Sequence, residues 1–368
     1  MEKGKIVALQ MCMMMYPAII ATAILAVPGI TARFAKQDLW LSPIWASLIG
    51  ILTLFIVIRL YKLFPQQSFF QICEQTIGKF TGKLLGLIYF YFLILNTGSM
   101  TRTYGEFIAG AFFAKTPKSV IMVSILILSA FAVLGGIEVV GRLAQIFFPI
   151  FSFSIFIIFI LLIPAYQPGN IMPILENGLL PSLKGAMVPQ AWFGETFIII
   201  FLLPFLTDAK KGLKWGMITV FIVLLTMVTT NIAVLFILGH NTAENVYPML
   251  VATRFVNLGE FIENLDPVII AVWVLGEFVK ITVFYYVTAL ATAQWLNLSG
   301  YKPLVWPLGI LIMEMSFWSL PNLMSKNNFD MFIFPFFSFV SQTLVPAFLL
   351  VIASMKKKVK GNAVKGNR

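Results

Sequence analysis

Glu195 is a carboxylate near the middle of an apolar stretch, Pro189–Thr207, that has the length of a membrane span. A charge within a span is costly, and it normally faces the interior of a helix bundle or a wet cavity. Small residues flank it in the sequence Gly194-Glu195-Thr196, and a proline stands near each end of the stretch. We therefore expect a helix that breaks at mid-depth. Glu195 then either faces a ligand amine or acts as a protonatable gate, or it is a neutral acid that supports the unwound backbone.

A second candidate break lies in the first apolar stretch, where Pro17 and Pro28 bracket the sequence Ala21-Thr22-Ala23. Small residues and a hydroxyl between two prolines are compatible with unwinding, and the freed N–H groups would bind an anion such as a ligand carboxylate. The alternative is a continuous helix whose small residues pack against a neighbour. The similar interruption around Glu195 favours the break.

Glu277 and Lys280 are two further charges within an apolar stretch, and their i, i+3 spacing puts them on one face of a helix. They form either a self-neutralised pair that faces the bundle, or Lys280 stands where a coupling cation would otherwise bind, or it pairs with another helix. Glu106 is a candidate partner on another helix. The spacing does not decide between these arrangements.

A small polar patch begins at Asn96 and Thr97 in the third apolar stretch. Polar side chains at this depth either line a cavity or mediate close helix packing. Zinc-ligand spacings, phosphate loops and nucleophile elbows do not occur in the sequence, so we expect no enzyme, no metal and no cofactor.

The elements that must position these residues are membrane helices. The chain has 368 residues, of which 60% are hydrophobic and only 11% are charged, and this composition is typical of an all-α polytopic membrane protein. We expect ten spans, at about Ile6–Ile30, Leu41–Leu63, Leu84–Phe113, Val120–Gly136, Leu143–Ile163, Met187–Thr207, Trp215–Leu238, Pro267–Trp295, Pro303–Leu320 and Met331–Met355.

Charge indicates how these spans are oriented. Lys and Arg are about twice as frequent on one side of the spans as on the other, which predicts that both termini are cytoplasmic. The net charge of +11 indicates contact with anionic lipid, and we expect no nucleic acid partner. Residues 1–355 are expected to form one transmembrane domain and residues 356–368 a basic cytoplasmic tail.

Spacing also predicts an internal repeat. A shift of the first five spans along the chain by about 174 residues places Thr22 on Thr196, and the second and third spans then fall near the seventh and eighth. Because five is an odd number, the second copy must enter the membrane from the opposite side. We expect a 5+5 inverted repeat, with copies at about residues 6–163 and 187–355.

With these features in place, the chain resembles the B subunit of spore nutrient germinant receptors, in the amino acid–polyamine–organocation superfamily. The resemblance is carried by IATAILAVPG in the first span, FGETFIIIFLLPF in the sixth and the exit sequence LLPFLTDAKK, and it covers nearly the whole chain. Superfamily transporters usually carry glycines at the first break, where this sequence has Ala-Thr-Ala.

The resemblance implies a leucine-transporter-like fold with broken first and sixth helices and a ligand pocket between spans one, three, six and eight. It implies a subunit that senses an amino acid, sugar or similar nutrient beside an A subunit and a lipoprotein C subunit in the inner membrane of a bacterial spore. The alternative is a proton-coupled permease for an amino acid or amine. The implied ligand-binding residues are Ala21, Thr22, Ala23, Asn96, Thr97, Gly194, Glu195 and Thr196.

Overall fold

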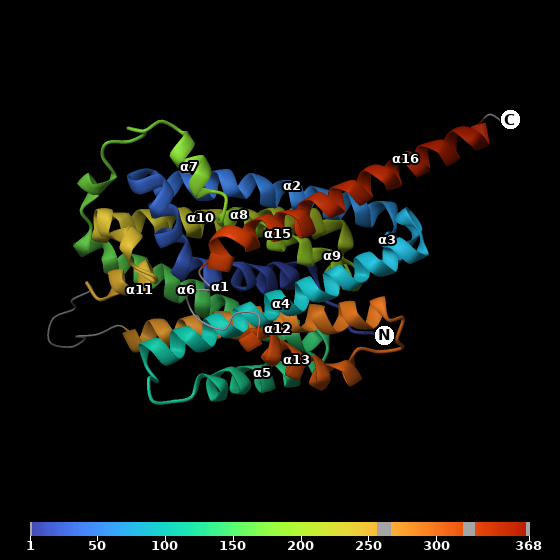
Figure 1. The fold of residues 1–368 in the computed structure, drawn as a ribbon, viewed down its shortest axis with the longest axis horizontal. Coiled ribbons are helices and arrows are strands. Elements are labelled where there is room, and N and C mark those ends of the chain that lie inside the picture. The colour runs from blue at the N-terminus through green and yellow to red at the C-terminus, as the bar shows by residue number, and fades with distance from the viewer. Residues whose placement is uncertain (1, 256–265, 319–327, 366–368) are drawn as a thin grey trace.

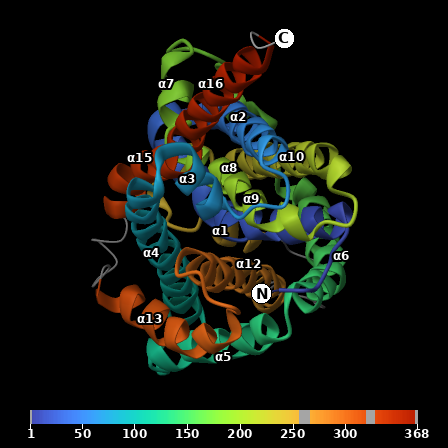
Figure 2. The same ribbon diagram turned by 90° about the vertical axis from the view of Figure 1, so that its right-hand side faces the viewer.

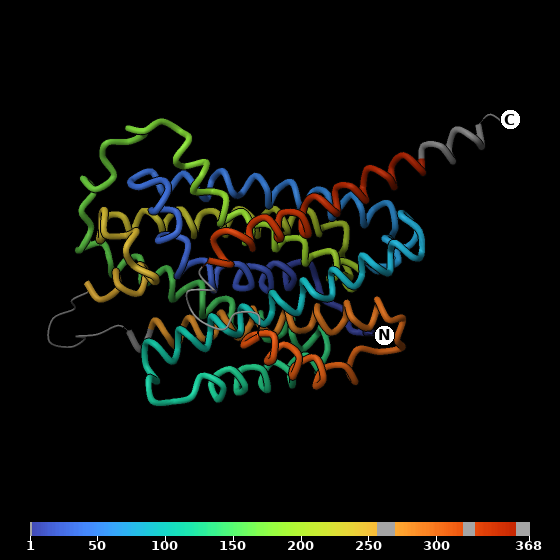
Figure 3. The backbone as a smooth tube through the Cα atoms, in the orientation of Figure 1, coloured from blue at the N-terminus to red at the C-terminus, as the bar shows by residue number. Residues whose placement is uncertain are grey.

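The protein is a bundle of long helices that run back and forth along one axis (Figure 1). The computed structural model describes residues 2–255, 266–318 and 328–365, and Figure 3 traces their backbone. Within these ranges the extended structure amounts to a single isolated bridge, between Ile6 and Leu206. An all-helical architecture is what a bilayer demands, because a helix satisfies its own backbone polar groups.

The helices correspond to the ten spans expected from the sequence. They are α1 (Ala8–Ala35), α2 (Ser42–Leu63), α4 (Lys79–Ala111), α5 (Lys118–Leu134), α6 (Ile137–Leu162), the sixth pass Pro189–Phe205, α10 (Gly212–Leu238), α12 (Asp266–Trp295), α13 (Val305–Trp318), and a tenth pass made of η10 (Phe329–Ile333), α15 (Phe334–Phe339), η11 (Val340–Leu344) and α16 (Val345–Lys365). Ser319 and Leu320, the end of the ninth expected span, lie outside the described residues.

Short helices connect these passes. They are η1 (Lys36–Leu41), α3 (Phe69–Ile77), η2 (Ile163–Ala165), η3 (Pro168–Ile171), α7 (Leu180–Gly185), η6 (Ala209–Lys211), η7 (Gly239–Glu244), α11 (Pro248–Thr253) and η9 (Lys302–Leu304). Both termini lie at the same end of the bundle (Figure 1), called the terminal end below. The last helix continues past the expected end of its span to Lys365, and residues 366–368 of the expected tail lie outside the described residues.

Hydrophobicity separates the central helices from the peripheral ones. In α12 every residue from 279 to 294 is buried, and in α1 every residue from 14 to 25 is buried. A helix that is apolar on all sides and enclosed by others is a core helix. By contrast, α6 exposes large side chains such as Phe153 and Phe156, as expected of a helix that faces lipid. Figure 2 shows α1 and α12 inside the ring of the other helices.

The expected break in the first helix is absent. α1 is a continuous α-helix of 28 residues, with Pro17 and Pro28 inside it. Proline is tolerated within a membrane helix because its neighbours satisfy the freed backbone groups. Alanine, which stands at two of the three expected break positions, is the strongest helix former, whereas glycine at those positions would weaken the helix.

The sixth pass does change its geometry where the sequence predicts an interruption. The α-helical stretch α8 (Pro189–Gly194) gives way at Glu195 to a 3-10 turn, η4 (Glu195–Ile198), followed by α9 (Ile199–Leu202) and η5 (Leu203–Phe205). The backbone tightens here, and it does not unwind into an extended segment. A mid-helix 3-10 stretch often marks a functional hinge.

Candidate functional site

Glu195 and Lys280 form a buried ion pair at the centre of the bundle. The Lys280 ammonium on α12 lies 3.0 and 3.2 Å from the two carboxylate oxygens of Glu195. The Lys280 and Glu195 side chains are 0% and 2% exposed. A buried pair of this kind is held by its mutual attraction, because either charge alone would be left without compensation. The pair therefore locks the 3-10 turn of the sixth pass to the central helix.

One of the arrangements left open for Lys280 is present in the structure. The lysine pairs with a carboxylate on another helix, and that carboxylate is Glu195. Glu106 is not its partner, because Glu106 forms ion pairs with Arg102 at 2.7 Å and with Lys118 at 2.5 Å. Glu277, one turn before Lys280, is completely buried as well.

A cavity leads from Glu195 toward the end of the bundle opposite the termini. Its lining includes three residues predicted to bind ligand, Thr22, Asn96 and Glu195, and also Glu106. On α1 the lining runs from Thr22 to Arg33, which is the half of that helix farther from the N-terminus. Glu195 therefore lies at the deep end of the cavity.

Other lining residues could not be identified from the sequence, because residues of these types are common in any span or loop. Trp192, Tyr247 and Phe334 contribute aromatic walls, and Arg33 lies toward the mouth. The indole N–H of Trp192 donates to the Thr22 hydroxyl at 2.8 Å, which joins α1 to the sixth pass. The position of Trp192 directly before Phe193-Gly194-Glu195 was the one available signal.

The remaining predicted ligand residues lie behind the cavity wall. Ala21, Ala23, Thr97, Gly194 and Thr196 are buried and are not among the lining residues. The carbonyl of Ala21 accepts a hydrogen bond from the Trp273 indole at 2.5 Å. Because α1 is continuous, it offers no freed N–H groups to a ligand, so the geometric basis for a carboxylate site at Ala21–Ala23 is lost.

Thr97 and Thr196 use their hydroxyls within the bundle. Thr97 donates to the carbonyl of Leu93 at 2.7 Å, and Thr196 donates to the carbonyl of Phe193 at 2.9 Å. Gly194 serves close packing, because a side chain there would collide with the amide of Gln342. The expected pocket between spans one, three, six and eight also needs correction. The tenth pass lines the cavity through Asp330, Met331 and Phe334, and α12 stands behind Glu195.

Asn96 has an unused hydrogen-bond donor in this cavity. Its side chain is 2% exposed, and its Nδ2 atom has no hydrogen-bond partner within the described part of the chain. A buried donor without a partner costs about 1–3 kcal/mol. The same residue lines the cavity, so a molecule bound there could remove this cost by supplying an acceptor.

The terminal end of the bundle is closed by residues 2–8, which we call the N-terminal strap. Ile6 exchanges backbone hydrogen bonds with the exit of the sixth pass, donating to Phe205 at 3.0 Å and accepting from Thr207 at 2.9 Å. The N–H of Ala8 donates to the carboxylate of Asp208 at 2.7 Å. The strap therefore fastens the start of α1 to the end of the sixth pass.

Glu2 anchors the other end of the strap. Its carboxylate accepts hydrogen bonds at 3.0 Å from the N–H of Ile137 and from the Tyr301 hydroxyl. Burial by itself would raise the pKa of Glu2, but hydrogen bonds from Gly4, Ile137 and Tyr301 to the ionised form outweigh it and hold the pKa below the usual 4.5.

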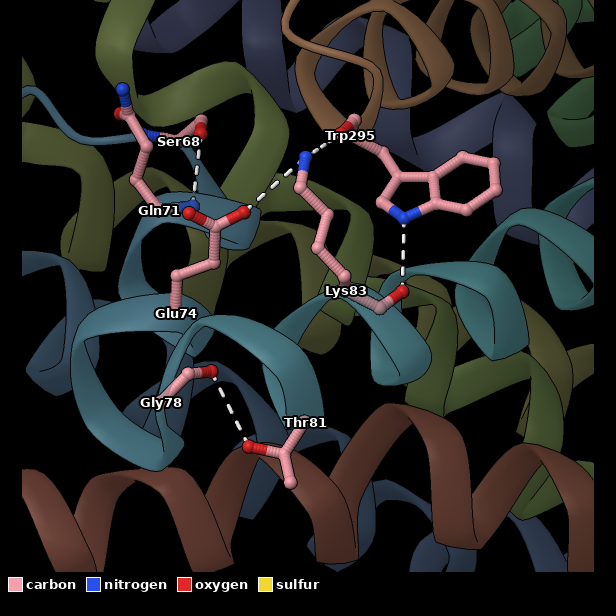
Figure 4. Close-up of polar contacts among 7 residues, drawn as sticks. All are labelled: Ser68, Gln71, Glu74, Gly78, Thr81, Lys83 and Trp295. Carbon is pink, nitrogen blue, oxygen red and sulfur yellow. Dashed lines mark hydrogen bonds and ion pairs between the residues drawn. The ribbon is translucent and has the colours of Figure 1, made fainter.

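A second clamp at this end joins α4 to α12 (Figure 4). The indole N–H of Trp295 donates to the Lys83 carbonyl at 2.9 Å, while the Lys83 ammonium donates to the Trp295 carbonyl and lies 3.3 Å from the carboxylate of Glu74. With the strap, these contacts close the bundle at the terminal end, whereas the cavity extends toward the opposite end.

Comparison with known proteins identifies the family. The profile of a family described as "Spore germination protein" matches residues 5–323. The chain belongs to this family. Spore germination protein KB of Bacillus subtilis (strain 168) is 26% identical over 367 residues, covering 97% of each chain. Spore germination protein YndE of the same strain is 23% identical and covers 96% of this chain and 98% of its own length.

A third relative, spore germination protein XB of Bacillus anthracis, is 26% identical over 251 residues, covering 68% of this chain and 70% of its own length. The sequence resemblance to germinant receptor B subunits is therefore confirmed, and the protein is an integral membrane protein.

Solved structures confirm the leucine-transporter-like fold of this spore germination protein. Mhp1, a nucleobase-cation-symport-1 family transporter, matches with a TM-score of 0.69 at 12% identity, over 94% of this chain and 78% of that chain. A Na⁺-coupled sialic acid symporter matches with a TM-score of 0.66 at 13% identity, over 95% and 89%. These similarities establish the fold.

Proposed function

We propose that this protein is the nutrient-sensing subunit of a spore germinant receptor and that a small nutrient binds in the cavity below Arg33. It acts in the inner membrane of a bacterial spore, with both termini cytoplasmic, beside A-type and lipoprotein C-type subunits. Family membership supports the role in germination. The observation that carries the ligand site is the Nδ2 atom of Asn96, which lies in the wall of the cavity without a partner among the described residues.

The Asn96 donor requires a ligand with a hydrogen-bond acceptor, such as a carboxylate, a carbonyl or a hydroxyl. Because α1 has no freed N–H groups, the ligand must be recognised by side chains. Asn96 provides a buried hydrogen-bond donor for this purpose. The carboxylates of Glu106 and Glu195 are already held by basic side chains. The aromatic walls at Trp192 and Tyr247 suit an apolar part of the ligand. An amino acid or a sugar meets these requirements.

Replacement of Asn96 by leucine tests this site. Asn96→Leu should raise the nutrient concentration needed for half-maximal germination by about tenfold, because one hydrogen bond in a desolvated site contributes about 1–1.5 kcal/mol. Germination of variant spores is followed as loss of optical density over a concentration series of common amino acids and hexoses, with the protein level measured in the spore membrane.

Thr97→Val is the matched control, since Thr97 is the next residue of α4 but does not line the cavity, and its hydroxyl bonds to Leu93 and Thr288. This variant should leave the half-maximal concentration within about twofold of the wild type. An unchanged response in Asn96→Leu spores, at normal protein level, would remove Asn96 from the site.

A proton-coupled permease for an amino acid or amine is the second candidate, favoured by the fold shared with two symporters. Uptake of a labelled nutrient into vesicles that contain only this chain separates the two functions. The sensing role predicts binding without accumulation. Accumulation that a proton ionophore abolishes would establish the permease.

A further inference from the structure

Glu314 is a carboxylate on the outside of the bundle, in a groove between α5 and α13. The two helices lie side by side at the periphery (Figures 1 and 2). The groove is otherwise largely apolar, and its lining includes Val123, Ile127 and Ile310. Ile310 is 68% exposed, and Glu314 is exposed as well. This face of the bundle therefore presents apolar side chains and one acid to its surroundings.

Glu314 lies within the expected ninth span, Pro303–Leu320. Val123, which shares the groove with Glu314, is five residues along α5 from Lys118, a distance of about 7.5 Å at 1.5 Å per residue. On α13, Glu314 lies one turn before Trp318, which is 82% exposed and has the character of an interfacial anchor. A carboxylate at this level borders hydrocarbon, where charges are rare and are normally paired.

Among the residues that the structure describes, no hydrogen bond or ion pair satisfies Glu314. The contrast with the other acids of the bundle is clear, since Glu195 and Glu106 are each held by basic side chains. The described part of the subunit supplies no positive charge to this acid, and a partner subunit that carries one would stabilise it.

We propose that the groove between α5 and α13 is the docking surface for a transmembrane helix of another subunit that carries a Lys or Arg at the level of Glu314. Gly309 and Ala130 line the groove, and small residues let a neighbouring helix approach closely. A second copy of this chain would bring the same carboxylate to a symmetric contact and would repel it. Lipid acyl chains provide no hydrogen-bond donor. The proposal goes beyond the sensing role by assigning a face and a chemistry to the partner.

The test uses the full chain in its native spore membrane. A photo-crosslinking amino acid replaces Ile310 in the groove and, as the control, Phe221 on α10, which is 63% exposed and distant from the groove. Cross-links from position 310 should reach one other protein, at a transmembrane helix with a Lys or Arg, as mapped by mass spectrometry. Cross-links to lipid alone, to a second copy, or equally from position 221 would overturn the proposal.

Charge variants then separate docking from mere proximity. Glu314→Gln should lower the yield of the cross-link at position 310 several-fold, and Glu314→Lys should abolish it. The thermal stability of the purified chain should not fall in either variant, because no described residue of the chain pairs with Glu314. Restoration of the cross-link when Glu314→Lys is combined with an acid at the mapped basic position would complete the evidence. An undiminished yield in Glu314→Lys would contradict it.

Discussion

The contact between Glu195 and Lys280 joins two residues that are 85 positions apart in the chain. The sequence predicts that each is costly in a membrane and must be compensated, and both predictions follow from charge and depth alone. Their pairing could not be predicted, because helical spacing identifies neighbours on one helix and says nothing of neighbours on another. The sequence identifies Asn96 for the same reason as Glu195, as a polar residue at depth, but only the packing of the helices shows that its Nδ2 donor has no partner among the described residues.

Removal of one charge of this pair should destabilise the protein strongly. Lys280→Met leaves the Glu195 carboxylate buried and uncompensated, so the free energy of unfolding should fall by about 3–5 kcal/mol. The double variant Glu195→Leu/Lys280→Met should recover most of that loss, because it removes both charges. Thermal unfolding of the purified protein in detergent measures both effects.

Arg142→Met is the control for the Lys280→Met variant. Arg142 pairs with Glu138 at 3.8 Å, and the two side chains are 74% and 48% exposed. An exposed pair contributes about 0–1 kcal/mol. If Lys280→Met cost no more than Arg142→Met, the central pair would be solvated and its assigned role would be wrong.

At the scale of elements, the two interruptions expected from the sequence have different outcomes. The sixth pass tightens to a 3-10 turn at Glu195. In this turn the Thr196 hydroxyl donates to the carbonyl of Phe193. Pro204, in the later 3-10 turn η5, lacks an N–H. α1 stays helical through Ala21–Ala23. The expectation of a break there came from the position of two prolines and from the matching position in the repeat. The local helix propensity of alanine prevailed over both.

Glycine substitution in α1 tests whether the helix is continuous. In a continuous helix, Ala23→Gly and Ala18→Gly should each lower the free energy of unfolding by about 0.5–1 kcal/mol, because glycine loses more backbone entropy in a helix than alanine does. Both positions are fully buried, so the two variants are matched. A cost at Ala18 without a cost at Ala23 would indicate that α1 is broken where the sequence suggested.

For the whole molecule, the ten passes and their order follow from apolar segment length, and this part of the fold was predictable. The direction in which the site opens was not predictable, because it depends on contacts between the ends of helices. The N-terminal strap and the clamp between Lys83 and Trp295 close the terminal end, and the cavity extends the other way. If the termini are cytoplasmic, as proposed, the site receives its ligand from the opposite side of the membrane.

The strap predicts a dependence of stability on pH. Because the pKa of Glu2 is lower in the folded protein than its usual 4.5, its contribution is fully present above pH 4.5 and is lost as the pH falls through the folded pKa. Glu2→Gln should therefore lower the melting temperature at pH 7 and have progressively less effect below pH 4.5. Glu244→Gln, at an exposed residue, is the control. A difference between Glu2→Gln and wild type that did not shrink in acid would show that the Glu2 charge does not hold the strap.

Protection of a cysteine in the cavity by nutrient tests the central claim most directly. Ser99 lines the cavity and both native cysteines are buried, so Ser99→Cys provides a single reporter for a small thiol reagent, with Asn241→Cys at an exposed site as the control. We predict that a nutrient that triggers germination slows labelling at position 99, with the concentration dependence of germination, and leaves position 241 unaffected. Unchanged labelling of position 99 at nutrient concentrations that trigger germination of the same variant spores would contradict a ligand site in this cavity.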